Sequence, residues 1–307
     1  MAKAISGGNQ MDEQVPISSS ATADTGKEEG VNEVTADLGY QRHAVVNNVY
    51  FGFPNSGAGK WVLIDTGVTG SAGRIESAAA KRFGKDAPPA AIVLTHGHSD
   101  HSGSAKALAE KWDVPIYAHT LELPYLDGRA SYPPPDTSLG GGIMSKLAPI
   151  FGRGPIDVSQ WLRTLPDDGI VPGMPGWRWM HTPGHTPGHV SLWREGDHTL
   201  IAGDAFITTN MESAYAVVTQ KEELHGPPTY FTTDWTAAKT SVGRLAGLVP
   251  ELVVTGHGKA MKGSLMRDAL NILARDFDRI AVPAEGRYVG ESARADETGP
   301  TYVPPKP

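Results

Sequence analysis

Short β-rich runs alternate with helical patterns through the middle of the chain. Two β-rich runs, residues 44–53 and 61–64, are separated by Pro54-Asn55-Ser56-Gly57, which predicts a hairpin. Apolar residues at helical spacing predict helices, and short apolar runs predict further strands. The helices are expected at 71–83, 103–112, 236–248 and 263–277, and the strands at 91–94, 115–118, 177–180, 190–193, 199–201 and 251–254. This mixture predicts sheets covered by helices, an α/β layered architecture.

The two ends of the chain differ in composition from the middle. Residues 1–35 are rich in Ser, Thr, Gly, Asp and Glu and have little to bury, which favours a disordered or loosely attached tail. Residues 282–307 are rich in Pro, Gly and charged side chains and predict a second tail. A chain of 307 residues that is 39% hydrophobic can bury a sizeable core. We therefore expect one domain over residues 36–281.

Composition narrows the chemistry and the partners. The chain has no cysteine, so a metal site would be built from histidine and carboxylate. A net charge of -7 and the lack of any Lys/Arg run disfavour nucleic acid as a partner. The first 14 residues lack the apolar region of a secretory signal, and no apolar run is long enough to span a bilayer. We expect a cytoplasmic protein that acts on a small molecule without contacting a membrane.

Polar side chains follow four of the predicted strands where each strand ends. Asp65 follows the strand at 61–64, and His96-Gly97-His98-Ser99-Asp100-His101 follows the strand at 91–94. Asp204 and His257 follow the strands at 199–201 and 251–254 in the same manner. Strand ends share one edge of a sheet, which is where α/β folds place their ligand crevices. Imidazole and carboxylate together suit zinc, with iron or manganese also compatible.

Residues 95–103, Thr-His-Gly-His-Ser-Asp-His-Ser-Gly, resemble the signature of the metallo-β-lactamase superfamily. Four further segments resemble that family's motifs, and all five occur in the family's order over roughly residues 61–258. They are Ile64-Asp65-Thr66-Gly67, the loop His181-Thr182-Pro183-Gly184-His185-Thr186-Pro187-Gly188-His189, Gly203-Asp204 and Thr255-Gly256-His257-Gly258. The resemblance implies an αββα sandwich of two mixed β-sheets with outer helices and the site at one edge.

The resemblance also implies two divalent metal ions, of which zinc is the expectation and iron or manganese the alternatives. The first would be held by His96, His98 and His185, and the second by Asp100, His101 and His257, with Asp204 bridging the two. Two such ions share a water, lower its pKa and polarise a substrate oxygen, so a bridging hydroxide is the expected nucleophile. Asp100 is also a candidate catalytic residue, because a carboxylate at this place can accept or pass a proton.

The remaining acids and histidines have alternative interpretations. Asp65 would orient a ligand or its loop, although a turn or helix-capping role is an equal alternative. His181 and His189 flank the metal loop, and we expect structural or hydrogen-bonding roles for them. His43, His119 and His198 are expected at the surface or hydrogen-bonded in the core. His225 lies in an insertion, where it could contact substrate.

The substrate class is less determined than the site. A bridging Asp204 is similar to the site of glyoxalase II and of lactonases, which favours cleavage of a small ester, lactone or thioester. A phosphodiesterase or β-lactam hydrolase of the same superfamily, and a non-hydrolytic metal-binding or redox module, are the alternatives. The insertions at 121–166 and 208–234 are expected to form a lid and a second wall, in which aromatic side chains such as Tyr215 contact substrate or pack the insertion. The oligomeric state is open, with a homodimer among the options.

Overall fold

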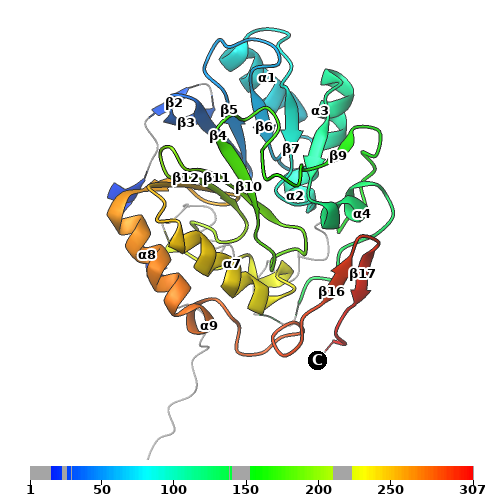
Figure 1. Cartoon of the computed structure of the whole chain (residues 1–307), viewed down its shortest axis with the longest axis vertical. Helices are drawn as coiled ribbons and strands as arrows, with labels where there is room; N and C mark the ends of the chain where they lie inside the picture. The colour runs from blue at the N-terminus through cyan, green and yellow to red at the C-terminus, as the bar shows by residue number, and fades with distance from the viewer. Residues whose placement is uncertain are drawn as a thin grey trace, which may run out of the picture.

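In the computed structural model, two β-sheets lie face to face between two layers of helices (Figure 1). The structure describes residues 15–22, 26–28, 30–137, 139, 153–209 and 223–306. The eight-stranded first sheet has the order β2-β3-β4-β5-β6-β7-β8-β9, and its strands are antiparallel from β2 to β6 and parallel from β6 to β9. Its strands are β2 Gly26–Glu28, β3 Val31–Thr35, β4 Leu38–His43, β5 Val46–Phe51, β6 Val62–Ile64, β7 Ala91–Val93, β8 Ile116–Ala118 and β9 Leu162–Thr164.

The second sheet has five strands in the order β10-β11-β12-β14-β15. Among these strands only the neighbours β12 and β14 are parallel, and the other three pairs are antiparallel. The strands are β10 Trp177–His181, β11 Val190–Arg194, β12 Thr199–Gly203, β14 Leu252–Thr255 and β15 Met261–Lys262. Both sheets are therefore mixed, as expected from the sequence.

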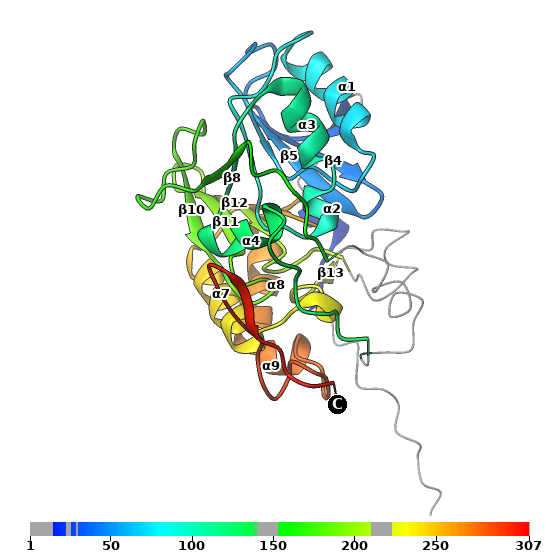
Figure 2. The same ribbon diagram turned by 90° about the vertical axis from the view of Figure 1, so that its right-hand side faces the viewer.

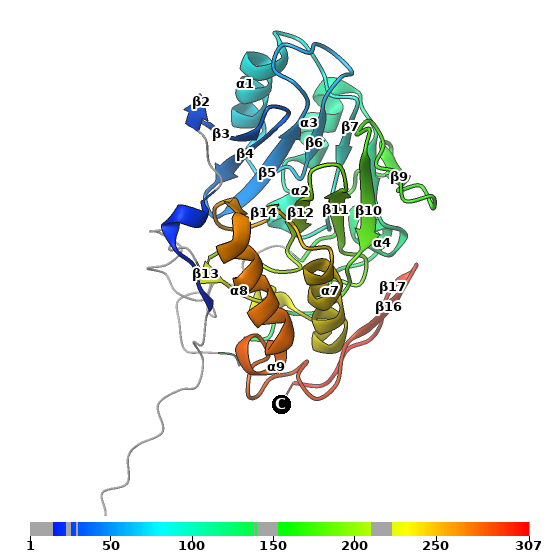
Figure 3. The same cartoon turned by 60° about the vertical axis from the view of Figure 1, so that its left-hand side comes forward.

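Helices cover the outer face of each sheet because their apolar stripes face inward. Helices α1 (Ala72–Phe83) and α3 (Ala105–Trp112) cover the first sheet, where residues such as Ile75 and Leu108 join a cluster with Leu63. Helices α7 (Trp235–Gly247) and α8 (Gly263–Arg275) lie on the opposite side of the sandwich (Figure 3). The short helices are η1 Ser19–Ala21, α2 Ser99–Ser102, η2 Thr120–Glu122, α4 Leu123–Leu126, η4 Thr229–Phe231 and α9 Phe277–Ile280.

A third apolar cluster fills the space between the two sheets. Ile64 and Val93 from the first sheet pack with Leu192, Ile201 and Val254 from the second, and all five are buried. A fully buried aliphatic side chain contributes roughly 1.5–3 kcal/mol, so this layer holds the sheets together. The αββα sandwich predicted from the sequence is confirmed.

Residues 1–35 and 282–307 were expected to form tails, but the parts of them that the structure describes are folded against the domain. Strand β1 (Val15–Pro16) pairs with β13 (Glu223–Leu224), and β3 belongs to the first sheet. Near the other end, β16 (Arg294–Asp296) and β17 (Gly299–Tyr302) form a hairpin close to α4 (Figure 2). The hydroxyl of the buried Tyr288 donates a 2.6 Å hydrogen bond to the Pro134 carbonyl. The few apolar side chains in these polar segments therefore have partners in the domain.

Each expected helix and strand agrees with an observed one to within a few residues, but several observed strands were not expected, among them β3, β4, β9 and β15. The run at 44–53 begins with a turn, since Ala44 has a φ of 58°, and β4 lies before it. Strand β9 was not expected either. Of the two insertions, residues 140–152 and Tyr215 lie outside the described residues. Among the residues that the structure describes, no helix is long and apolar enough to cross a membrane.

Candidate metal centre

The predicted ligands come from loops that follow strands of both sheets. The loop after β7 carries His96, His98, Asp100 and His101, with the last two in the short helix α2. The other three ligands follow strands of the second sheet, namely His185 after β10, Asp204 after β12 and His257 after β14. The structure brings all seven together at one end of the sandwich.

The first half of the site consists of three histidines. The ligand atoms of His96, His98 and His185 all lie within 4.8 Å of one another. Nδ1 of His98 is 2.9 Å from Nε2 of His185. All three side chains are buried, and burial lowers the pKa of His96 and His185 well below the usual value and that of His98 to about 4. These imidazoles are therefore neutral, the form that binds a metal ion.

The second half combines histidine and carboxylate. The ligand atoms of Asp100, His101 and His257 also lie within 4.8 Å of one another. Asp204 reaches both halves, since its Oδ2 is 3.2 Å from His257 Nε2, 3.4 Å from His101 Nε2 and 3.5 Å from His185 Nε2. This position is the one expected of a bridging carboxylate.

Charge pairing dominates the second half. Burial alone would lower the pKa of His101, but the carboxylates, led by Asp204, raise it well above its usual value. Burial would likewise raise the pKa of Asp204, whereas His257 and His101 together hold it well below the usual range. A divalent cation could take the place of the protons that these histidines otherwise retain.

Each second-half histidine is oriented by a hydrogen bond from its Nδ1. His101 Nδ1 lies 2.8 Å from Asp65 Oδ2, and His257 Nδ1 lies 2.8 Å from the Val45 carbonyl oxygen. With Nδ1 donating, Nε2 of each ring presents a lone pair to the centre. Asp65 thus acts through His101, and it also accepts hydrogen bonds from the backbone and hydroxyl of Thr95.

Buried polar atoms at the centre suit a bound cation. His96 Nε2 and Asp204 Oδ1 are buried and have no hydrogen-bond partner among the described residues. An unsatisfied buried polar atom lowers the stability of the fold by about 1–3 kcal/mol. A metal ion bound to these atoms would remove that penalty. The donor set of five histidines and two aspartates without cysteine fits two divalent cations of the zinc, iron or manganese type.

The sequence around this site matches a known protein family. Residues 45–257 match the model of the metallo-beta-lactamase superfamily. The chain belongs to the metallo-β-lactamase superfamily. It is 47% identical over 235 residues to the probable metallo-hydrolase YflN of Bacillus subtilis (strain 168), a match that covers 76% of this chain and 89% of that protein. It is 25% identical over 187 residues to the hydroxyacylglutathione hydrolase of Bdellovibrio bacteriovorus, covering 56% of this chain and 60% of that protein.

Solved structures of the superfamily share the fold. A beta-lactamase domain protein from Burkholderia ambifaria matches with a TM-score of 0.56 and 22% identity, over 83% of this chain and 79% of that one. A B3 metallo-beta-lactamase with an active-site glutamic acid matches with a TM-score of 0.53 and 18% identity, over 82% of this chain and 90% of that one. The family and its relatives establish this chain as a metallo-hydrolase.

His189 has the hydrogen-bonding role that was expected. Its Nε2 accepts a 2.9 Å hydrogen bond from the backbone N–H of Asp204, and burial lowers the pKa of His189 to about 3. Asp204 is therefore held by a neutral imidazole that can accept. Gly203 makes this contact feasible, because a Cβ at that position would lie 2.6 Å from His189 Nε2.

The other histidines lie apart from the seven ligands. His43 is buried, with Nε2 2.7 Å from Asn48 Oδ1. The rings of His119 and His181 stack 4.2 Å apart, and His181 Nε2 lies 2.8 Å from the Pro187 carbonyl oxygen. His198 is on the surface, where its Nδ1 lies 3.1 Å from the Val249 carbonyl oxygen. His225 is buried with Nδ1 3.1 Å from the Gly226 carbonyl oxygen, and its contact with substrate stays a prediction.

The sequence reasoning missed Glu122, a fully buried acid beside the site. Its carboxylate accepts hydrogen bonds from Gly97, Tyr132, Thr186 and Gly188. Burial raises the pKa of Glu122, and those four donors oppose the rise. The signal that could have found it is an acid between two leucines, at Leu121-Glu122-Leu123. A buried acid in such a run needs partners.

Proposed function

We propose that this metallo-hydrolase cleaves a small ester, lactone or thioester at a centre of two divalent ions, with zinc as the expected metal. The observation that carries the proposal is the position of Asp204, whose Oδ2 lies within 3.5 Å of a nitrogen in both histidine groups. A carboxylate shared in this way supports two ions that act on one substrate.

Two divalent cations would supply the acidity that makes water a nucleophile near neutral pH, and would polarise the scissile carbonyl. The chain's own side chains fix where this happens. The side chain of Asp100 is 26% exposed, while the other six ligand side chains are buried. Asp100 is therefore the ligand through which a proton can pass between the centre and solvent, the catalytic role predicted for it.

Aromatic side chains beside His98 support an apolar acyl substrate. The ring of Tyr132 lies 4.5 Å from that of His98, and the ring of Phe231 lies 5.5 Å from it. These rings belong to the two expected insertions and flank the three-histidine half. They favour an apolar group next to the carbonyl over a polyanion, as does the net charge of -7. The relative named hydroxyacylglutathione hydrolase supports an acyl compound as well.

The proposal is tested by a metal assay and a substrate screen on the same preparation. We expect about two divalent ions per chain, and turnover of lactones, thioesters or aryl esters above that of phosphodiesters and β-lactams. The His98→Ala variant should keep its fold by circular dichroism and lose turnover. A protein without metal after metal-supplemented expression, or full turnover by His98→Ala, would contradict the site. Activity confined to phosphodiesters or β-lactams would overturn the substrate class in favour of those alternatives.

A further inference from the structure

Glu122 lies where three parts of the molecule meet. It ends the short helix η2 that follows strand β8. Its Oε2 accepts a 2.9 Å hydrogen bond from the backbone N–H of Gly97 and another from the Tyr132 hydroxyl. Its Oε1 accepts a 2.7 Å hydrogen bond from the backbone N–H of Gly188 and a 2.8 Å bond from the Thr186 hydroxyl. Oε2 is therefore bonded to the loop that contains Gly97, and Oε1 to the loop that contains Gly188.

Those two loops carry the three histidines of the first half-site. Gly97 lies between His96 and His98 in the loop from the first sheet, and Thr186 directly follows His185 in the loop from the second sheet. We propose that Glu122 is a positioning residue that fixes the spacing of these two loops and so sets the metal affinity of the three-histidine half. The proposal rests on the metal centre proposed above and goes beyond it.

The planar carboxylate of Glu122 fixes the position of one loop relative to the other. The two oxygens of one carboxylate are held rigidly, so loops bonded to opposite oxygens cannot shift independently. Metal ligands must be held within about 0.5 Å of the productive geometry, and His98 Nδ1 and His185 Nε2 lie 2.9 Å apart across the two loops. A shift of either loop would open this pair. All four donors point at Glu122, so it acts through the loops rather than as a ligand itself.

The glycines around Glu122 show that the close approach depends on this sequence. A Cβ at Gly188 would lie 2.7 Å from Glu122 Cγ and 2.8 Å from its Oε1. A Cβ at Gly97 would lie 2.6 Å from the Tyr132 hydroxyl. Both backbone N–H groups therefore reach the carboxylate only because no side chain stands in the way.

The second half-site offers an internal reference. His101 is oriented by Asp65 rather than by Glu122, through the 2.8 Å contact between Asp65 Oδ2 and His101 Nδ1. Loss of Glu122 should thus weaken one of two metal-binding events, whereas loss of Asp65 should weaken the other. A general loss of stability would affect both events together.

The sharpest variant is Glu122→Gln. An amide replaces one acceptor oxygen by an NH2 group, and the Thr186 and Tyr132 hydroxyls can rotate to accept from it. A backbone N–H cannot, so either Gly97 or Gly188 is left facing a donor. Titrating the metal-stripped full chain with Zn²⁺ by calorimetry should give two binding events in the wild type. In Glu122→Gln, one event should weaken about 10- to 100-fold while the other stays unchanged.

Matched variants assign the affected event and guard against misfolding. Asp65→Asn should weaken the event that Glu122→Gln spares. Thr186→Val, which removes one donor, should weaken the same binding event as Glu122→Gln. Thr186→Ser, which keeps the hydroxyl, should bind Zn²⁺ at that event like the wild type. If Glu122→Gln does not fold, the Thr186→Val and Thr186→Ser pair decides the matter.

Three results would overturn the inference. Folded Glu122→Gln with both events at wild-type affinity would do so, as would an equal weakening of both events. Equal Zn²⁺ affinities for Thr186→Val and Thr186→Ser would also overturn it. A wild-type chain that binds no Zn²⁺ would instead refute the metal centre itself.

Discussion

Asp65 and His101 are joined by a 2.8 Å contact between Oδ2 and Nδ1, and both side chains are buried. Asp65 adopts a φ of 57° at the end of strand β6, which turns its carboxylate towards the next loop. There it also accepts from the backbone N–H and the hydroxyl of Thr95. The carboxylate of Asp65 therefore holds Thr95 and orients His101, a candidate ligand of the second half.

The first prediction concerns Asp65→Asn. Asparagine tolerates the left-handed conformation, so the backbone should be retained while one acceptor is lost. We expect about 10- to 100-fold weaker binding at the Asp100, His101 and His257 half, with a matching fall in kcat. Metal titration and steady-state kinetics measure both. Asp278→Asn, whose carboxylate forms a largely exposed ion pair with Lys239, is the control and should behave like the wild type. Unchanged metal binding by Asp65→Asn would show that the contact is dispensable.

The second prediction concerns the glycine before His257. A Cβ at Gly256 would lie 2.0 Å from Asp204 Oδ1 and 2.7 Å from His101 Cε1. Gly256→Ala should therefore displace the bridging carboxylate, abolish binding at one or both metal positions and lower the melting temperature. Gly243→Ala is the control, because Gly243 lies in helix α7 with nothing within 4 Å of its Cβ position. It should raise stability by about 0.5–1 kcal/mol. Normal metal content in Gly256→Ala would argue against a close-packed bridge.

The third prediction concerns Phe231, whose ring lies 5.5 Å from that of His98. Phe231→Ala should lower kcat/KM about tenfold for esters with bulky apolar acyl groups, and less for acetyl esters. The loss should fall mainly on KM, because in the proposed function the ring would contact the acyl group of the substrate rather than the reacting atoms. Phe53→Ala removes an aromatic ring that is 61% exposed and serves as the control. An equal loss for all acyl lengths would indicate a packing role instead.

The fourth prediction concerns pH. Burial lowers the pKa of His43 from 6.5 to about 4, so the unfolded chain takes up this proton first as the pH falls. The stability that neutral His43 confers is complete above about pH 6.5 and is lost as the pH falls towards 4.

His43→Gln keeps a donor for Asn48 without titrating. In urea unfolding of the metal-free protein at pH 7.5 and pH 5, its free energy of unfolding should fall less than that of the wild type, by on the order of 1 kcal/mol. Parallel pH dependence in the two proteins would mean that His43 does not titrate on unfolding.

The clustering of the seven candidate ligands was predictable because the information for it is local. Each candidate lies in a short motif just past a strand with a simple apolar pattern, as His257 does past β14. Glu122 has no such signature, since its partners Gly97 and Gly188 are 25 and 66 residues away in the sequence. Only the folded chain brings them together.

The missed strands have a related cause. Strand β4 contains Gln41 and His43, which are buried because the Tyr50 hydroxyl donates to Gln41 Oε1 and because Asn48 partners His43. Buried polar pairs of this kind remove the apolar alternation that predicts a strand. The expected tails were wrong because composition averages over a segment, whereas single apolar residues such as Tyr288 decide where it is anchored.

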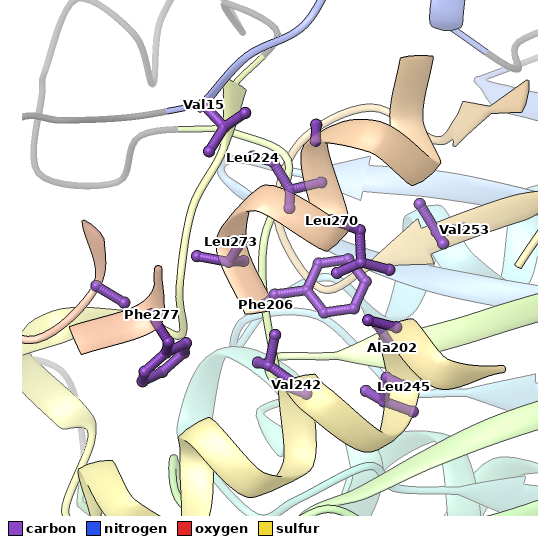
Figure 4. Close-up of a cluster of buried hydrophobic side chains, with 14 of the residues drawn as sticks. Val15, Ala202, Phe206, Leu224, Val242, Leu245, Val253, Leu270, Leu273 and Phe277 are labelled. Atoms are coloured by element: carbon purple, nitrogen blue, oxygen red, sulfur yellow. The ribbon is translucent and has the colours of Figure 1, made fainter. Parts of the chain in front are cut away.

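Because the candidate ligands come from both sheets, the stability of the folded protein should depend on the concentration of free divalent metal. The loop after β7 belongs to one sheet, and Phe206, two residues after Asp204, packs between α7 and α8 behind the other (Figure 4). Ions held between these two loops would tie the sheets together. A ligand present at 1,000 times its dissociation constant adds about 4 kcal/mol to stability. Turnover by proteases should therefore rise when free divalent metal is scarce, so the abundance of this enzyme would follow the metal status of its surroundings.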